Sequence, residues 1–254
     1  MVIIMKYLLI TKNLTKRFGG LIAVNKVNIK VKEKSLTLLI GPNGSGKSTF
    51  INTCTGILKP DKGRVIFDGH DITGKPPHEV YELGFVRTFQ IPSPFATLTV
   101  LDNVLASMKN PGEHPLKALL RSTWLEKEEE NTKKALAILK RVGLDEYWDR
   151  QAFALSGAHL KLLELARALA TGAKLIALDE PIAGVDPAFA DQILQYLKSL
   201  KEGLGITFLV VEHRIDLAVP YADYAYAMDR GNLIAEGKPD DVVNNPKVVE
   251  VYIG

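Results

Sequence analysis

This sequence lacks several features that mark particular classes of protein. Cys54 is its only cysteine, so the chain cannot form an internal disulfide and we expect a reducing compartment. No stretch approaches the roughly 18 apolar residues of a membrane span. The opening residues 1–10 are interrupted by Lys6 and contain no small-residue cleavage site, which argues against a signal peptide. If the protein serves a membrane process, we expect another chain to cross the bilayer.

A strong excess of charge of one sign is also missing. The 32 Lys and Arg residues nearly balance the 29 Asp and Glu residues, and the formal net charge is +3. This bias is too weak to indicate a nucleic-acid partner. There are no internal repeats and no low-complexity linkers. The 254 residues, 46% of them hydrophobic, are sufficient for one α/β domain with a sizeable core, in which we expect Cys54 to be buried.

Short apolar or β-branched runs alternate with turn signals in the first part of the chain. They predict strands at residues 7–10, 25–31, 36–40 and 64–67, and a helix at residues 48–58. Between about residues 92 and 155 helical periodicity takes over. Its clearest segment is 125–142, where Leu136, Leu139 and Val142 should share one apolar face before Gly143 ends the helix.

The last hundred residues return to alternating helices and buried strands. The pattern predicts helices at residues 159–170 and 189–200, strands at 175–178 and 207–211, and a hairpin around residues 229–232. Such alternation is typical of a parallel sheet with crossover helices.

A glycine-rich loop between the expected strand 36–40 and the helix that follows matches the phosphate-binding pattern G-x-x-x-x-G-K-[ST]. Its residues are Gly41, Pro42, Asn43, Gly44, Ser45, Gly46, Lys47 and Ser48, followed by Thr49. The glycines let successive backbone N–H groups turn inward around the phosphates. Lys47 would then reach the outer phosphates, and the Ser48 hydroxyl would coordinate Mg²⁺. The loop therefore predicts that ATP or GTP is bound together with Mg²⁺.

Two carboxylates follow the apolar run 175–178, at Asp179 and Glu180. Ligands of parallel α/β sheets bind at the carboxyl ends of the strands, where these side chains should lie. We expect Asp179 to hold Mg²⁺, usually through water. We expect Glu180 to polarise the water that attacks the γ-phosphate.

The segment Leu155-Ser156-Gly157-Ala158-His159 begins another predicted helix, and its serine precedes Asp179 by 23 residues. A serine and a glycine at a helix N-terminus can bind an anion. Taken alone, Ser156 would be an ordinary helix cap.

The motifs follow one another in the order phosphate loop, Leu-Ser-Gly, Asp-Glu-Pro and a later His. With these motifs the chain resembles the ATP-binding subunits of ATP-binding-cassette (ABC) transporters over essentially its full length. The resemblance implies an α/β fold: a P-loop NTPase core with a mostly parallel sheet, an N-terminal antiparallel β subdomain and an α-helical subdomain. We predict a single ABC ATPase domain over residues 1–254. Residues 1–91 and 156–254 would form the core, and residues 92–155 the helical insert.

The resemblance also implies roles for single residues. Phe18 would stack on adenine, although a core aromatic at a strand edge is the alternative. Gln90 would sense Mg²⁺ and the membrane subunit, Asp186 would communicate across a dimer, and His213 would contact the γ-phosphate. Two subunits pair head to tail in this family, so each nucleotide would also meet the partner's signature residues. These are Ser156, Gly157 and Ala158.

Finer features are similar to the ATPases of branched-chain amino-acid importers. They are Arg87-Thr88-Phe89-Gln90, residues 95–104, the insert 110–130 and the ending 237–254. The resemblance implies that the chain energises the import of branched-chain or other hydrophobic amino acids and that it lies at the cytoplasmic face of the membrane. The partners would be a second ATPase subunit in a homo- or heterodimer, transmembrane permease subunits and, indirectly, a substrate-binding protein. Lipopolysaccharide-export ATPases share several of these features and remain an alternative.

The signature departs from the usual Leu-Ser-Gly-Gly-Gln at Ala158 and His159. A weakly hydrolytic, regulatory subunit is therefore a second hypothesis, because a Cβ at Ala158 stands where backbone and phosphate approach. A soluble ABC ATPase acting on DNA or ribosomes is a third. One cassette without a coiled-coil insertion or a basic tail argues against it. The intact set of Lys47, Gln90, Asp179, Glu180 and His213 favours an active ATPase.

Overall fold

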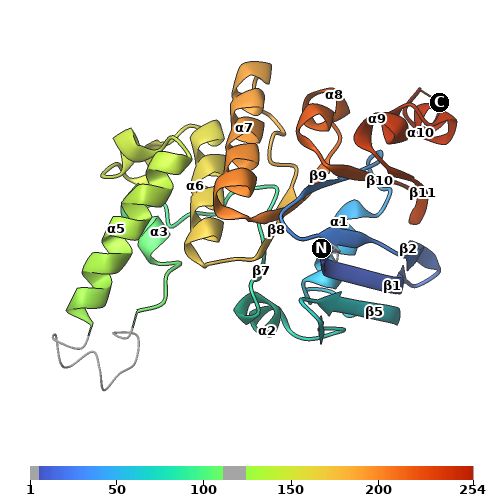
Figure 1. Cartoon of the computed structure of the whole chain (residues 1–254), viewed down its shortest axis with the longest axis horizontal. Coiled ribbons are helices and arrows are strands. Elements are labelled where there is room, and N and C mark those ends of the chain that lie inside the picture. Colours follow the sequence, from blue (N-terminus) through green and yellow to red (C-terminus); the bar gives the residue numbers. More distant parts are fainter. Residues whose placement is uncertain (1–5, 111–123, 254) are drawn as a thin grey trace, which may run out of the picture. The chain divides into compact units, whose positions relative to one another are not determined.

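The computed structural model describes residues 6–110 and 124–253 (Figure 1), and the chain divides at Gln90 and Lys174. One unit contains Met1–Gln90 and Lys174–Gly254, and the other contains Ile91–Ala173. We predicted that the core would resume at Ser156. The boundary lies later because the helix that begins after Ser156 packs on the other helices of the second unit.

The first unit contains an antiparallel sheet in which β1 is the central strand. Its strands are β1 (Tyr7–Phe18), β2 (Leu21–Val27), β3 (Lys30–Lys32), β5 (Lys62–Phe67) and β6 (His70–Asp71). β1 pairs with β2, β3 and β5 and is longer than predicted. The predicted strand 25–31 is wrong as a continuous strand. Lys26 has a positive φ, and the Thr11 hydroxyl bonds both Val27 and Ile29, so the chain breaks between β2 and β3.

A second sheet has the order β11-β10-β4-β9-β8-β7 among the described residues. These strands are β4 (Leu36–Ile40), β7 (Phe85–Arg87), β8 (Leu175–Asp179), β9 (Thr207–Glu212), β10 (Tyr224–Asp229) and β11 (Asn232–Gly237). All pairs are parallel except the predicted hairpin of β10 and β11. Every residue of β4, β8 and β9 is buried, which explains their continuous apolar sequences.

The helices of this unit are α1 (Lys47–Cys54), α2 (Pro77–Glu82), α7 (Pro187–Leu204), α8 (Ile215–Ala218), α9 (Pro239–Val243) and α10 (Pro246–Ile253). α1 ends earlier than the predicted residue 58. Gly56 has φ +79°, and a Cβ there would lie 2.1 Å from the Lys75 carbonyl oxygen, so the chain turns away instead. Cys54 is buried as expected, and burial raises the pKa of its thiol.

The second unit contains α3 (Val100–Leu105), α5 (Leu125–Arg141) and α6 (Gly157–Ala170), which pack on one another. Residues 111–123, part of the predicted insert 110–130, lie outside the described residues. Leu139 and Val142 are buried as predicted, but Leu136 is 39% exposed. Asn131 and Ala135 complete the buried stripe instead, because steps of four residues keep a helix side facing one neighbour. The amide of Asn131 donates to the Lys109 carbonyl.

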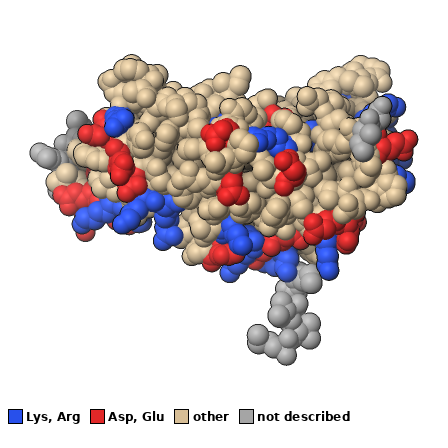
Figure 2. Space-filling view, turned by 90° about the horizontal axis from the view of Figure 1, so that it is seen from above, with Lys and Arg blue, Asp and Glu red and all other residues tan. Residues whose placement is uncertain are grey.

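Charged side chains of both signs are mixed over the face shown in Figure 2. Among the described residues, no helix combines the length and apolar character needed to cross a membrane.

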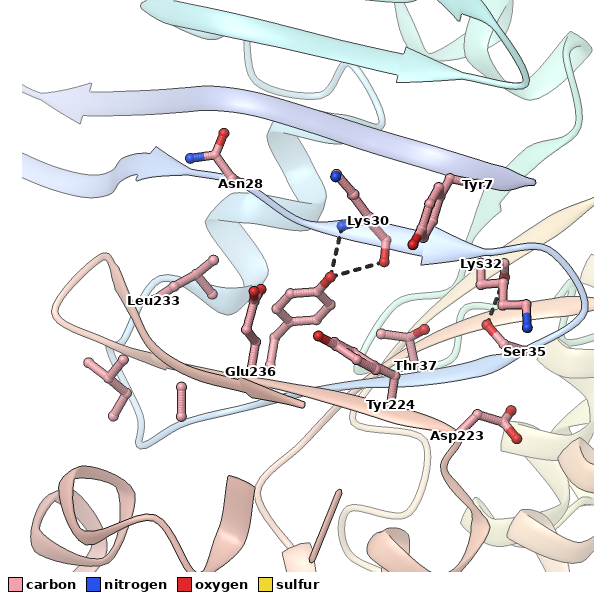
Figure 3. A pocket seen from close by; sticks show the side chains of 13 residues that line it. Tyr7, Asn28, Lys30, Lys32, Ser35, Thr37, Asp223, Tyr224, Leu233 and Glu236 are labelled. Carbon is pink, nitrogen blue, oxygen red and sulfur yellow. Dashed lines mark hydrogen bonds between the residues drawn. The ribbon is translucent and has the colours of Figure 1, made fainter. Parts of the chain in front are cut away.

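A cavity of about 830 Å³ opens in the first unit between strands of both sheets (Figure 3). Tyr7, Lys30, Tyr224, Tyr226 and Glu236 are among its lining residues. The Tyr226 hydroxyl accepts a hydrogen bond from the Lys30 N–H and donates one to the Lys30 carbonyl, both at 3.0 Å. None of the predicted nucleotide-site residues lines this cavity.

Candidate nucleotide-binding site

The phosphate-loop sequence joins the end of β4 to the start of α1. Gly41, Gly44 and Gly46 all have positive φ. A Cβ on Gly41 would lie 2.2 Å from the Met228 carbonyl oxygen, and one on Gly46 would lie 2.2 Å from the Ala23 carbonyl oxygen. Close backbone approach and backbone conformation therefore both require glycine at the two ends of the loop.

Lys47 begins α1, and its ammonium group lies inside the loop. Nζ donates to the carbonyl oxygens of Gly41 at 2.7 Å and Pro42 at 2.9 Å. Burial lowers the pKa of Lys47, and the negative charges of Glu180 and Asp179 oppose that shift. The loop thus encloses a cation that is close to the carboxylates of Asp179 and Glu180.

Ser48 and Asp179 meet although they are far apart in the sequence. β4 and β8 both run parallel to β9, so their carboxyl ends lie at the same edge of the sheet. The Ser48 hydroxyl donates to Asp179 Oδ1 at 3.4 Å. Asp179 is only 4% exposed, so its carboxylate faces the interior of this edge.

The other Asp179 oxygen is held by Arg87, the last residue of β7. The guanidinium Nη2 is 2.7 Å from Asp179 Oδ2, and Nη1 donates to the Asn52 side chain on α1. Arg87 belongs to the motif that resembles branched-chain amino-acid importers, but it was not among the predicted site residues. Its position at the end of an apolar run, as for Asp179, was the available signal.

Glu180 follows Asp179 in the left-handed backbone region, with φ +53°, which is strained for a residue with a side chain. Its N–H donates to the Val211 carbonyl at 2.9 Å. Gln90 Nε2 donates to Glu180 Oε2 at 2.8 Å, and His213 Nδ1 lies 3.7 Å from Glu180 Oε1. Gln90, Glu180 and His213 are therefore neighbours, from three separate parts of the sequence.

Glu212 is a further residue that sequence analysis missed. It is fully buried and accepts hydrogen bonds from the backbone N–H groups of Ile182, at 2.9 Å, and His213, at 3.2 Å. Burial raises the pKa of its carboxyl group. The next arginine, Arg214, donates to the Val185 carbonyl at 2.8 Å. These contacts fix the chain that leads to Asp186.

We expect the stability contribution of Glu212 to depend on pH. Its carboxyl pKa is higher in the folded protein than the ordinary 4.5. Its stabilisation of the folded state is therefore fully present at a pH below 4.5. The contribution is lost as the pH rises through the folded-state pKa. Glu212→Gln does not titrate, so the free energy of unfolding of the wild type relative to the variant should fall over this range. Urea unfolding at a series of pH values measures it, and a constant difference would contradict the expectation.

Phe18 and Asp186 lie apart from the contacts described so far. Phe18 ends β1, is 47% exposed and has Lys16 Nζ 5.5 Å from its ring centre. Its exposure rules out the alternative of a core aromatic. The Asp186 carboxylate accepts from the Phe189 N–H at 3.0 Å and caps α7.

The signature residues belong to the second unit. Ser156 caps α6 by accepting from the His159 N–H at 3.3 Å, and its hydroxyl is also 2.6 Å from His159 Nδ1. The imidazole packs on the Tyr147 ring, with 4.6 Å between the centres. Gly157 and Ala158 form the first turn of α6, with open space around the Gly157 Cα. His159 thus holds the hydroxyl of the signature serine.

A glycine loop at the end of one parallel strand, with its lysine close to carboxylates at the end of another strand of the same sheet, defines a P-loop nucleotide-binding domain. The chain belongs to the ABC transporter family, whose family model matches residues 24–183. Residues 232–254 match a second model, described as branched-chain amino acid ATP-binding cassette transporter. The family confirms the predicted α/β fold and classifies the chain as an ATP-binding ATPase subunit.

Individual relatives agree with this assignment. The chain is 52% identical over 244 residues to the probable branched-chain amino acid transport ATP-binding protein LivG of Archaeoglobus fulgidus, covering 96% of this chain and 94% of the relative. It resembles the ADP conformation of MJ1267, an ATP-binding cassette of an ABC transporter. The TM-score is 0.86 at 49% identity, covering 98% and 99% of the two chains. It also resembles the dimeric structure of MJ0796, a bacterial ABC transporter cassette, with TM-score 0.75 at 30% identity, covering 91% and 98%.

Proposed function

We propose that this chain hydrolyses ATP to energise the import of branched-chain or other hydrophobic amino acids. The observation that carries the hydrolytic part is the Glu180 carboxylate, held by Gln90 beside Asp179 and close to Lys47. A carboxylate fixed at the end of a central strand, next to a phosphate-binding loop, can take a proton from a water molecule. The names of the relatives support the transported class.

The residues at the carboxyl ends of β4 and β8 fit Mg²⁺. Ser48 Oγ and Asp179 Oδ1 are hard oxygen donors that approach each other from two elements. No group of three or more His, Cys, Asp or Glu side chains is arranged for a metal in residues 6–110 and 124–253. Mg²⁺ suits such a sparse site, because it usually takes one or two protein ligands and completes its shell with water and phosphates. When bound, it would neutralise charge on the phosphates.

Each side chain then has a distinct task. Lys47 binds the phosphates together with the N–H groups of Gly41 and residues 43–49, and Phe18 offers its exposed ring to adenine. Glu180 accepts the proton of the attacking water. Gln90 orients that carboxylate and senses Mg²⁺, and His213 contacts the γ-phosphate. The buried Lys47 cation stabilises the charge on the outer phosphates.

A second subunit completes the site in this proposal. The dimeric cassette among the similar structures supports pairing of two subunits, and we propose that they pair head to tail. Ser156, Gly157 and Ala158 of one subunit would then meet the nucleotide on the phosphate loop of the other, with the N-terminus of α6 favouring the negative charge. Asp186 would lie at the same interface. Closure of the dimer would bring the phosphate loop of one subunit and the signature residues of the other together around the nucleotide.

Permease subunits and a substrate-binding protein are the further partners we propose, with the chain at the cytoplasmic face of the membrane. The transporter family supports this arrangement.

Transport is the test of the substrate class. The chain is reconstituted with its permease subunits in proteoliposomes that enclose ATP, and the substrate-binding protein is added outside. The uptake of labelled leucine is compared with that of labelled glutamate. The expected result is ATP-dependent uptake of leucine alone, lost with Glu180→Gln. Equal uptake of leucine and glutamate would contradict the proposed substrate class but leave the ATPase assignment intact.

A further inference from the structure

Arg87 is a buried cation. Neither the phosphate loop nor the catalytic carboxylate explains by itself why a cation is buried there. It pairs with Ala177 in the register of β7 on β8, and its side chain is only 9% exposed. Charged side chains are seldom buried this far unless they are paired. Its Nε atom is buried without a hydrogen-bond partner among the described residues. This costly placement suggests that the outer nitrogens of the guanidinium do specific work.

Those two nitrogens connect the elements that carry the proposed Mg²⁺ ligands. Nη2 is 2.7 Å from Asp179 Oδ2, and Nη1 donates to Asn52. Asn52 comes four residues after Ser48 on α1, so the two side chains lie on the same side of that helix. Arg87 therefore connects the helix side that presents Ser48 with the carboxylate of Asp179.

We propose that Arg87 is the positioning residue of the Mg²⁺ site, holding Asp179 Oδ2 so that Oδ1 faces Ser48. This inference rests on the proposed Mg²⁺ site. The carboxylate has two oxygens, and the structure uses one for Arg87 and turns the other to the Ser48 hydroxyl at 3.4 Å. A partner that fixes a ligating group in this way strengthens metal binding without touching the metal.

The planar guanidinium suits this task better than an ammonium group. It presents donors in a fixed fork, so one side chain can engage Asn52 and Asp179 together. A lysine at the same position would be a point charge that contacts one partner well. Three residues later Gln90 holds Glu180, so the segment 87–90 orients both the last carboxylate of β8, Asp179, and the carboxylate that directly follows it.

The test measures how strongly Mg²⁺ improves nucleotide binding. The affinity of the full chain for a non-hydrolysable ATP analogue is determined by calorimetry, once with excess Mg²⁺ and once with EDTA. We divide the dissociation constant in EDTA by the dissociation constant in Mg²⁺. This ratio should fall about tenfold or more in Arg87→Met, the range seen when such supporting partners are removed. Arg87→Lys should restore part of the ratio.

Lys201→Met is the matched control. Lys201 pairs with Asp223 at 2.9 Å, in the same unit but with no contact to the proposed Mg²⁺ ligands among the described residues. Its loss removes a largely buried ion-paired cation, as Arg87→Met does, and should leave the ratio at the wild-type value. A purely structural role of Arg87 would likewise lower the unfolding temperature without changing the ratio.

The outcomes separate the inference from the proposal on which it rests. If Mg²⁺ fails to improve nucleotide binding by the wild type, the proposed metal site is wrong. If the wild type responds to Mg²⁺ and Arg87→Met keeps or increases the ratio, the role of Arg87 is overturned. Should Arg87→Met not fold, Arg87→Lys is compared in the wild type and in Asp179→Asn. An equal effect in both backgrounds would overturn the role, because Arg87 must act through Asp179.

Discussion

Glu180→Gln is expected to lower the ATPase rate about 10²- to 10⁴-fold while ATP still binds. Glutamine keeps the size of the side chain and an oxygen for the Gln90 amide, but it cannot accept a proton from water. The lost proton transfer corresponds to about 3–5 kcal/mol of activation free energy. ATP hydrolysis and calorimetric ATP binding are measured on the same preparation.

Glu236→Gln is the control for this prediction, because Glu236 is an exposed carboxylate on β11 away from the phosphate loop. Its ATPase rate should equal that of the wild type. ATP-dependent dimerisation of Glu180→Gln, followed by size-exclusion chromatography, should exceed that of the wild type, which hydrolyses its ATP. Undiminished hydrolysis in Glu180→Gln would show that another group is the base.

Gly46→Ala is expected to abolish ATP binding and destabilise the chain. The residue has φ +104°, and a Cβ would lie 2.2 Å from the Ala23 carbonyl oxygen, a backbone atom that cannot move aside cheaply. The unfavourable backbone conformation alone costs on the order of 1–3 kcal/mol. The collision adds to this and displaces the loop whose N–H groups face the phosphates. Urea unfolding and calorimetric ATP binding measure the two effects.

Gly44→Ala separates the two causes within the same loop. Gly44 also has a positive φ, +78°, but nothing lies within 4 Å of its Cβ position. This variant should lose stability through backbone strain alone and keep measurable ATP binding. Equal losses in both variants would mean that the contact with Ala23 is unimportant.

The local chemistry of the site could be predicted from the sequence. The glycine pattern before Lys47 and Ser48 requires a loop that wraps around phosphates, since few other sequences permit its backbone angles. The apolar runs before Gly41 and Asp179 indicated buried parallel strands, and their ends meet at one edge as expected. The Asp179 and Glu180 carboxylates therefore lie beside the loop as predicted.

Predictions failed where distant segments decide the outcome. The strand predicted at residues 25–31 breaks because of the Thr11 hydroxyl, which lies on another strand. Leu136 is exposed because α3 and α6 determine which side of α5 is buried. The domain boundary moved past Ser156 for the same reason, since α6 packs on helices of the second unit.

Sequence alone thus determined the family and the residues of the phosphate loop, because those depend on residue type at short, fixed spacings. Only the tertiary structure decided how the carboxylates are held. Arg87 pairs with Asp179, Gln90 donates to Glu180, and the Ile182 N–H donates to the buried Glu212. These contacts join residues separated by 30 to 92 positions. The spacing of a motif carries no information on such contacts, since burial and hydrogen-bond partners are set when the strands align at one edge of the sheet.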